Sequence, residues 1–259
     1  MMWMRRRVLG VLFAAMCTIT SARAQKSSVI TLRIAAASDL QPVMPAFARA
    51  FERETGIKLE VSFGSSSALA TQIENGAPFD VFLGADFSFP EKVVAAGLAD
   101  EKAPVAYAGG TLVLWARKDS PIQPVSVDRL SDPKVTRIAV ADEFHAPYGR
   151  AAYAAMRQMK LLDPLRSKLV TAENIAQTAQ FVESGNAQAG FISLTLANSP
   201  HLKEVGSYAR IPAVYPKIRQ CGVVLKHSSH LEQARAFMKW IVSPKVQENL
   251  KEFGLDPVL

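Results

Sequence analysis

Two short segments place serine residues directly after a β-type run, at the point where a helical run begins. They are AAASDL, residues 35–40, and FGSSSAL, residues 63–69. A helix start offers up to four unpaired backbone N–H groups and about half a positive charge from the aligned peptide dipoles. A serine hydroxyl beside these groups adds a further donor. Two such turns that face each other predict a cradle for a small anion that needs no charged side chain.

The triple serine is the more specific of the two segments. One residue is enough to cap a helix, whereas Ser65, Ser66 and Ser67 stand together here. Gly64 precedes them and allows the backbone to come close to a bound group. The sequence contains neither G-x-G-x-x-G nor G-x-x-x-x-G-K-[ST], so a nucleotide-binding loop has little support.

The second half of the chain repeats this chemistry at three further turns. Tyr148, in the segment APYGR, and Ile175, after Glu173 and Asn174, each follow a strand-like run and would offer a first-turn N–H group. Ser193 lies near the end of a third run and would point its hydroxyl toward the same place. Each turn alone is equally typical of an ordinary helix cap, so only their combination indicates an anion-binding site.

Strand-like and helix-like runs alternate along the whole chain, which predicts an α/β fold with mainly parallel sheets. The runs form two groups joined by two extended crossings, which indicates a two-lobed clamshell whose cleft lies beyond the carboxyl ends of the strands. We expect residues 25–108 and 226–259 to form the first lobe. The second lobe is expected to comprise residues 109–225, with crossing strands near 109–118 and 217–225.

The first 24 residues have the pattern of a signal peptide for export to the periplasm. Arginines at positions 5–7 precede an apolar run over residues 8–19, and Ala22-Arg23-Ala24 predicts cleavage after Ala24. The apolar run is shorter than the about 20 residues that a membrane span needs. Cys17 raises the alternative of a lipid anchor, but Met16 precedes it where that signal requires a small residue, so an anchor is not expected.

Removal of this segment changes the composition. The formal charge falls from +7 to +3, because four arginines and no acid are removed. The basic character is therefore no argument for nucleic-acid binding. One cysteine, Cys221, remains in the mature chain, so no internal disulfide can form, and its place in an apolar run predicts a small buried hydrophobic residue. A globular monomer without cofactor is expected.

At these turns the sequence resembles the periplasmic molybdate-binding proteins of ABC transporters, which have the type II periplasmic-binding-protein fold. The resemblance covers nearly the whole mature chain, and its motifs are AAASDL, the segment over residues 62–86, HAPYGRAAY at 145–153, TAEN at 171–174 and the closing segment at 243–254. It implies a non-enzymatic carrier that binds molybdate or tungstate as a whole oxyanion and delivers it to an integral-membrane ABC permease.

The family holds its tetrahedral oxyanion with neutral donors, and the resemblance carries these over residue by residue. The corresponding positions are Ser38, Ser66 and Ser193, together with Tyr148 and Ile175, which would act through their backbone N–H groups. Ser65 and Asp39 are secondary positions. Ser193 departs from the pattern, because the family often has a tyrosine there. A serine reaches less far, so this contact either runs through a water molecule or is missing.

Two charged residues near these turns need separate interpretation. Asp39 can act as a first-turn acid directed at its own helix, which we favour, or as an inward carboxylate that would accept a hydrogen bond from phosphate. Arg150 is expected to be a solvated helix residue, and His145 to lie at the surface or behind the site.

Three alternative classes remain to be compared. A hydrolase lacks support, because there is no G-x-S-x-G motif and no motif ties a histidine to a serine nucleophile. The effector domain of a transcription regulator is excluded by the export signal and the lack of a DNA-binding region. A binding protein of the same fold for sulfate, phosphate, a ferric complex or an organic acid stays open. Discrimination from sulfate would depend on cavity size.

Overall fold

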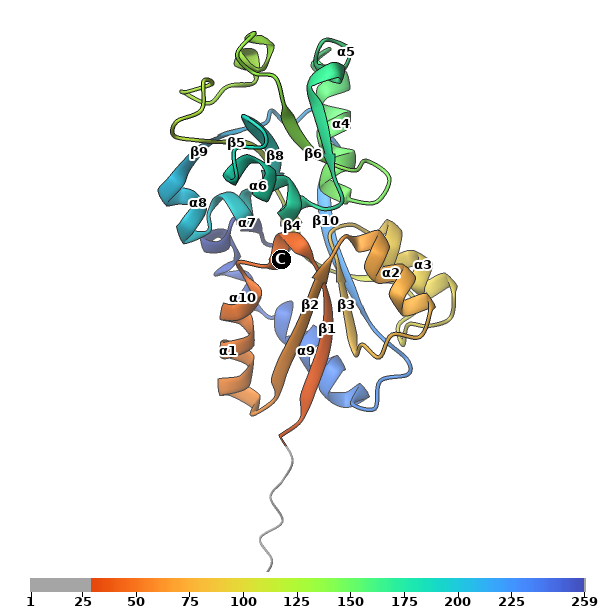
Figure 1. The fold of residues 1–259 in the computed structure, drawn as a ribbon. Helices are drawn as coiled ribbons and strands as arrows, with labels where there is room; N and C mark the ends of the chain where they lie inside the picture. Colours follow the sequence, from red (N-terminus) through yellow and green to blue (C-terminus); the bar gives the residue numbers. More distant parts are fainter. Residues whose placement is uncertain (1–28, 259) are drawn as a thin grey trace, which may run out of the picture.

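The computed structural model describes residues 29–258. The predicted signal peptide, its cleavage after Ala24 and Cys17 lie outside the described residues. Two β-sheets with flanking helices form two lobes, one above the other in Figure 1, and two extended chain crossings connect them. The predicted α/β class with two lobes is confirmed.

The first lobe contains a six-stranded sheet with the strand order β11-β4-β10-β3-β1-β2. Its elements are β1 (Thr31–Ala37), η1 (Ser38–Leu40), α1 (Met44–Thr55), β2 (Lys58–Gly64), α2 (Ser66–Glu74), β3 (Val81–Gly84), α3 (Ser88–Ala95), β4 (Val105–Gly110), β10 (Ile218–Val224), α9 (Leu231–Ile241), α10 (Pro244–Gln247), η4 (Leu250–Phe253) and β11 (Leu255–Asp256).

The second lobe contains a five-stranded sheet with the order β7-β6-β8-β5-β9. Its elements are β5 (Leu112–Arg117), η2 (Val127–Ser131), β6 (Ile138–Ala141), α4 (Pro147–Gln158), α5 (Leu162–Leu165), η3 (Arg166–Lys168), β7 (Leu169–Ala172), α6 (Ile175–Glu183), β8 (Ala189–Ser193), α7 (Leu194–Ala197), α8 (Pro200–Val205) and β9 (Gly206–Arg210).

Both sheets are mixed, so the expectation of mainly parallel sheets was wrong: antiparallel pairs outnumber parallel pairs in the first sheet and equal them in the second. The strand-helix units pair in parallel, β1 with β2 and β3, and β6 with β7 and β8. The strands nearest the crossings pair antiparallel, β10 with β3 and β4, and β5 with β8 and β9. The cause is the path of the chain, which enters and leaves the second lobe through β4 and β10.

The position of β10 differs from the expected lobe boundary. The sequence analysis placed residues 217–225 in the second lobe, whereas β10 pairs with β3 and β4 of the first sheet along most of its length. The second crossing therefore lies between β9 and β10, over residues 211–217. The first crossing is short, from the end of β4 at Gly110 to the start of β5 at Leu112.

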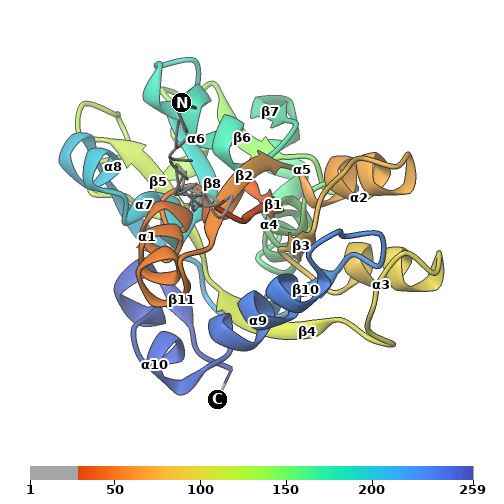
Figure 2. The same ribbon diagram turned by 90° about the horizontal axis from the view of Figure 1, so that it is seen from below.

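Alternate residues of β1 pack into two different cores, because successive side chains of a strand point to opposite faces of the sheet. Leu32 and Ile34 pack with aromatic residues of α1 and α9, whereas Ala35 packs with apolar residues of α2 and α3. Figure 2 shows α1 and α9 on one side of this sheet and α2 and α3 on the other. Burial on both faces fixes the register of β1 and therefore the place where it ends.

The helix α1 buries one apolar face against the first sheet. Its buried residues are Met44, Phe47 and Phe51, and it ends at Gly56, whose φ of 74° is the left-handed conformation that favours glycine. Among residues 29–258, no helix is both long and apolar enough to cross a membrane.

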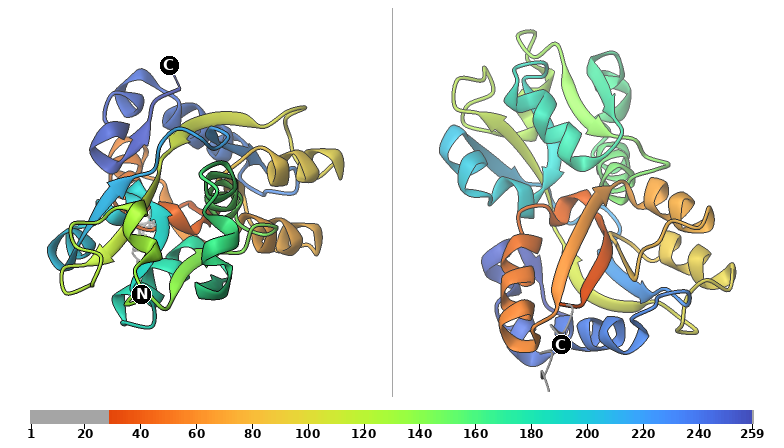
Figure 3. Two further views of the ribbon diagram at one scale, coloured as in Figure 1. Left: turned by 90° about the horizontal axis from the view of Figure 1, so that it is seen from above. Right: turned by 60° about the horizontal axis from the view of Figure 1, so that its bottom comes forward.

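The carboxyl ends of the parallel strands of both sheets point into the space between the lobes (Figure 3). The strands β1, β2, β6 and β7 each end where a helix begins within a few residues. The fold therefore gathers four helix starts at the interface of the two lobes.

Phe51→Ala tests the core on one face of the first sheet. Phe51 is fully buried and makes edge contacts with the rings of Phe237 and Trp240, at centroid distances of 5.2 and 5.4 Å. Urea unfolding should show a loss of about 3 to 5 kcal/mol in the free energy of unfolding. The control is Phe144→Ala, at a side chain that is 73% exposed, where the change should stay within about 0.5 kcal/mol. Equal changes in the free energy of unfolding for the two substitutions would contradict the assignment of Phe51 to this core.

Candidate anion-binding site

Four helix starts line one small cavity between the lobes. They are the first residues of η1, α2, α4 and α6, and the residues that line the cavity are Ala37, Ser38, Asp39, Gly64, Ser65, Ser66, Ala85, Ala146, Pro147, Tyr148, Asn174 and Ile175. The cavity volume of about 10 Å³ is far below the range of about 300 to 1,000 Å³ that drug-sized ligands occupy. The cavity therefore suits a small ligand.

The three consecutive serines have three different roles. Ser65 caps α2, because its Oγ accepts a hydrogen bond from the N–H of Ala68 at 3.2 Å. The Oγ of Ser66 accepts from the N–H of Ala85 at 3.1 Å, so its hydroxyl proton remains free to be donated elsewhere. Ser66 is 1% exposed and lines the cavity. Its hydroxyl is therefore a positioned donor toward a bound group.

The two helix starts of the second lobe each leave an N–H group for the cavity. Asn174 caps α6 by accepting from the N–H groups of Ala176 and Gln177, both at 3.0 Å, and the N–H of Ile175 is left over. In α4, Pro147 occupies the first position and the N–H of Tyr148 follows. Neither the Ile175 N–H nor the Tyr148 N–H has an acceptor within the described part of the chain. These two groups are first-turn donors at the cavity.

Gly149 allows α4 to start so close to its strand. A Cβ atom at this position would overlap the carbonyl oxygens of Ala141 and Asp142, at and just after the end of β6. Backbone atoms cannot move aside as a flexible side chain can. Glycine therefore sets the approach of α4 to β6 and with it the position of the Tyr148 N–H.

Ser193 is the predicted residue that does not line the cavity. Its side chain is fully buried and acts within its own turn, where the Oγ accepts from the N–H of Leu196 at 3.3 Å and shares a hydrogen bond of 2.7 Å with the Thr195 hydroxyl. Thr195 in turn donates to the backbone oxygen of Asp39 at 2.7 Å. Ser193 thus supports a contact between the lobes. The other six predicted positions, Ser38, Asp39, Ser65, Ser66, Tyr148 and Ile175, come together in the cavity.

No lysine, arginine or histidine is among the residues that line the cavity. Asp39 is the one ionisable acid there, and it is fully buried. Its Oδ2 accepts from the side-chain amide of Gln220 at 2.5 Å, and the same amide nitrogen lies 3.2 Å from the hydroxyl of Tyr148. Burial raises the pKa of the Asp39 carboxyl to about 7, and the hydrogen bonds from Gln220 and Tyr148 offset only part of this effect.

This geometry corrects the favoured interpretation of Asp39. The start of η1 has no side-chain cap, and the carboxyl of Asp39 faces β10 and α4. Gln220 could not be linked to Asp39 from the sequence, because 181 positions separate the two. The only local signal was a polar residue at the start of the apolar run QCGVVL.

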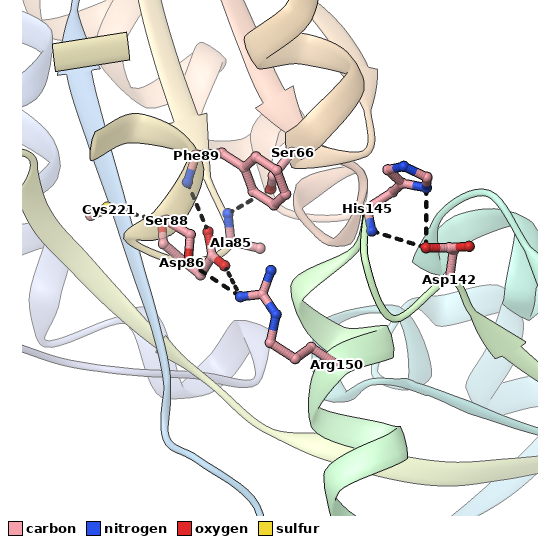
Figure 4. Close-up of polar contacts among 9 residues, drawn as sticks. All are labelled: Ser66, Ala85, Asp86, Ser88, Phe89, Asp142, His145, Arg150 and Cys221. Carbon is pink, nitrogen blue, oxygen red and sulfur yellow. Dashed lines mark hydrogen bonds and ion pairs between the residues drawn. The ribbon is translucent and has the colours of Figure 1, made fainter. Parts of the chain in front are cut away.

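The lobes contact each other beside the cavity through an ion pair, which Figure 4 shows, and a backbone hydrogen bond. A nitrogen of the Arg150 guanidinium, on α4, lies 2.6 Å from the carboxylate of Asp86, on the loop after β3. The N–H of Ser67 donates to the backbone oxygen of His145 at 3.3 Å. The structure thus has its two lobes closed. Arg150 is 43% exposed on its helix, as expected, but its partner Asp86 in the other lobe was not predicted.

His145 and Cys221 lie as predicted. The side chain of His145 is 62% exposed, and its Nδ1 lies 3.1 Å from Asp142, outside the cavity. Cys221 is fully buried in β10, and its thiol donates to the backbone oxygen of Asp86 at 3.0 Å. Burial raises the pKa of this thiol well above its ordinary value, so it stays protonated.

A closed cavity between two α/β lobes, lined by helix-start donors and serine hydroxyls, defines a binding protein of the two-lobed type for a small anion. The comparisons with known proteins agree with this class. The family described as bacterial extracellular solute-binding protein matches residues 32–256, and the chain belongs to this family.

Two curated relatives are named molybdate-binding protein ModA. The one from Azotobacter vinelandii is 34% identical over 86% of this chain and 88% of its own length. The one from Rhodobacter capsulatus is 35% identical over 79% of each chain. The solved structure of an Azotobacter vinelandii periplasmic molybdate-binding protein superposes with a TM-score of 0.79 at 32% identity, covering 86% of this chain and 98% of the other. A more distant relative, from a Pseudomonas species, is 24% identical over 96% of this chain and is named aconitate isomerase.

The pKa of Asp39 gives a prediction for stability as a function of pH. The carboxyl titrates near 3.8 when exposed and near 7 when folded, so between these values the folded state holds a proton that the unfolded state lacks. The free energy of unfolding should therefore fall as the pH rises from about 4 to about 7 and then level off. Asp39→Asn removes this contribution. Across that pH interval, the free energy of unfolding of the variant should increase by on the order of 2 to 4 kcal/mol relative to that of the native protein.

Thermal unfolding of both proteins across this pH range, without ligand, measures the difference. Asp163→Asn is the control, because the Asp163 side chain is 91% exposed and should give a constant difference. A constant difference for Asp39→Asn as well would contradict the raised pKa.

Proposed function

We propose that this chain is a periplasmic carrier that captures molybdate, with tungstate as its analogue, and delivers it to an ABC permease. The observation that carries the proposal is the convergence of four helix starts on a small cavity whose lining has no basic side chain. The names of the two most similar relatives described above supply the identity of the ion. Export by a signal peptide cleaved after Ala24 and action as a monomer are parts of the same proposal.

The donors in the cavity match the chemistry of a fully deprotonated dianion. Molybdate and tungstate carry no proton near neutral pH, so they need donors and no acceptor. The hydroxyl of Ser66 and the N–H groups of Tyr148 and Ile175 are such donors, and Ser38 lines the same cavity. Each hydrogen bond to a charged group contributes about 1.5 to 3 kcal/mol. Several of them acting together can hold the dianion when the lobes close around it.

A carrier fits the cavity better than an enzyme does. Ser38 and Ser66 are the candidate nucleophiles, but no histidine or lysine that could serve as their base is among the lining residues. Sulfate has the same charge and shape as molybdate and is the strongest alternative ligand. Its bonds are shorter than those of molybdate, so discrimination between the two ions depends on the spacing of the donors around the cavity.

The two-lobed architecture allows the protein to capture the ion when the lobes close and to release it when they open. The first lobe comprises residues 30–110 and 218–258, the second residues 111–217, and the short crossings between them act as the hinge. The bound ion contacts helix starts from both lobes and thereby stabilises the closed form, which is the form that a permease would bind.

Ser66→Ala tests the cradle by isothermal titration of residues 25–259 with molybdate, tungstate, sulfate and phosphate. Loss of one charge-assisted hydrogen bond of about 1.5 to 3 kcal/mol should raise the Kd for molybdate about 10- to 150-fold. Ser67→Ala is the matched control, because the contribution of Ser67 is its backbone N–H; its Kd should change less than about threefold. The proposed ligand would be contradicted if sulfate or phosphate bound most tightly, or if none of the four ions bound.

Arg150→Met tests the contact between the lobes. The pair with Asp86 forms when the lobes close, and its loss should speed dissociation of molybdate by about two- to tenfold with little change in the association rate. Stopped-flow kinetics measure both rates. Arg166→Met is the control, because Arg166 pairs with Asp163 within the second lobe. An unchanged dissociation rate for Arg150→Met would show that the pair does not hold the lobes closed.

A further inference from the structure

Asp39 is an acid beside a cavity that the proposed function fills with a dianion, and none of the described residues that line this cavity has a basic side chain. We propose that Asp39 binds a proton whenever the anion is bound, so that the cavity takes up one proton with each dianion and offers the ion donors only. This inference rests on the proposed function and specifies the protonation state of the loaded site.

Two buried atoms without partners support the proposal independently of any titration. In the described part of the chain, Oδ1 of Asp39 and Oε1 of Gln220 are the buried side-chain atoms that lack a hydrogen-bond partner. Both are acceptors when Asp39 is ionised, and a buried unpaired acceptor costs about 1 to 3 kcal/mol. A proton on Oδ1 of Asp39 turns this atom from an unpaired acceptor into a donor. Protonation therefore leaves one buried unpaired acceptor fewer.

The surroundings of Asp39 contain no charge that would keep it ionised. The titratable groups that face it are the hydroxyls of Tyr148, on α4, and Tyr107, on β4, and burial raises the pKa of both well above the ordinary value, so both are neutral. From the other elements around it come the neutral side chains of Gln220 on β10 and Thr195 on α7.

Two basic residues on the elements that face Asp39 are directed elsewhere. Arg219, next to Gln220 on β10, lies over the ring of Phe87 at 4.9 Å from the centroid. Arg150 pairs with Asp86. An ionised Asp39 together with a dianion would therefore place three negative charges in one closed cavity without a basic side chain in its lining, which is strongly unfavourable in a medium of low dielectric constant.

A proton on Asp39 also determines which anions fit. The protonated carboxyl offers no charged acceptor, so the cavity favours ions that carry no proton of their own. An ionised Asp39 would instead accept a hydrogen bond from monohydrogen phosphate. Asp39 is thus a specificity-determining residue, and the proton that it takes from solvent as the lobes close excludes phosphate.

The experiment is titration of residues 25–259 with molybdate at about pH 8.5 in two buffers with different enthalpies of ionisation, repeated at several values down to about pH 6.5. The difference in heat between the buffers counts the protons bound. Near pH 8.5 we expect close to one proton per anion, and a Kd that rises about tenfold for each pH unit above the pKa of Asp39. Asp39→Asn should take up no proton, show a constant Kd, and bind at least tenfold more tightly than the native protein at about pH 8.5.

Several outcomes would overturn the inference. Tight binding of molybdate by the native protein with no proton uptake and a constant Kd would refute it while leaving the proposed function intact. Loss of binding in a folded Asp39→Asn variant at every pH would mean that the carboxylate itself is required. Tighter binding of phosphate than of molybdate, weakened by Asp39→Asn, would assign Asp39 as an ionised acceptor. Absence of molybdate binding at every pH would refute the proposed function together with the inference. Asp163→Asn serves as the control and should match the native protein throughout.

Discussion

The cost of moving a dianion out of water into a closed cavity is the constraint on which the site depends. Without a basic side chain in the lining, the charge must be met by dipoles and hydrogen-bond donors that are already in place. Helix starts provide such donors, because their first N–H groups lack intrahelical partners and the helix dipole adds partial positive charge. One helix start supplies one or two donors, so several must meet at one point. The fold meets this requirement with four.

The arrangement of the two sheets follows from that requirement. Parallel strand pairs bring the ends of β1 and β2 together in the first lobe and the ends of β6 and β7 in the second. The antiparallel strands β4 and β10 belong to the first sheet and connect it with the second lobe, and β10 brings Gln220 into contact with Asp39. Gly149 lets α4 start against β6, and Gly110 leaves room for the hydroxyl of Tyr148. The donors are thus set by backbone geometry, which holds them rigidly.

Local patterns in the sequence were enough to predict most strands, most helices and the first-turn N–H groups of Tyr148 and Ile175, but not β4, β9 or β11. Ser66 was singled out among the three serines by the family resemblance, and the structure brings it into one cavity with Tyr148 and Ile175. A helix start is defined by its own few residues and so can be recognised in the sequence. The partners of Asp39 and Arg150 could not be predicted, because Gln220 and Asp86 lie 181 and 64 positions away and meet them only in the folded, closed molecule. For the same reason β10 was assigned to the wrong lobe.

A crystal structure of the molybdate complex tests the central claim most directly, because anomalous scattering from molybdenum locates the ion without reference to the surrounding protein. The account predicts one ion in the cavity, with its oxygens about 2.7 to 3.2 Å from Oγ of Ser66 and from the backbone nitrogens of Tyr148 and Ile175. The lysine and arginine side chains should lie beyond hydrogen-bond distance. An ion bound elsewhere, or held in the cavity by a basic side chain, would contradict the account.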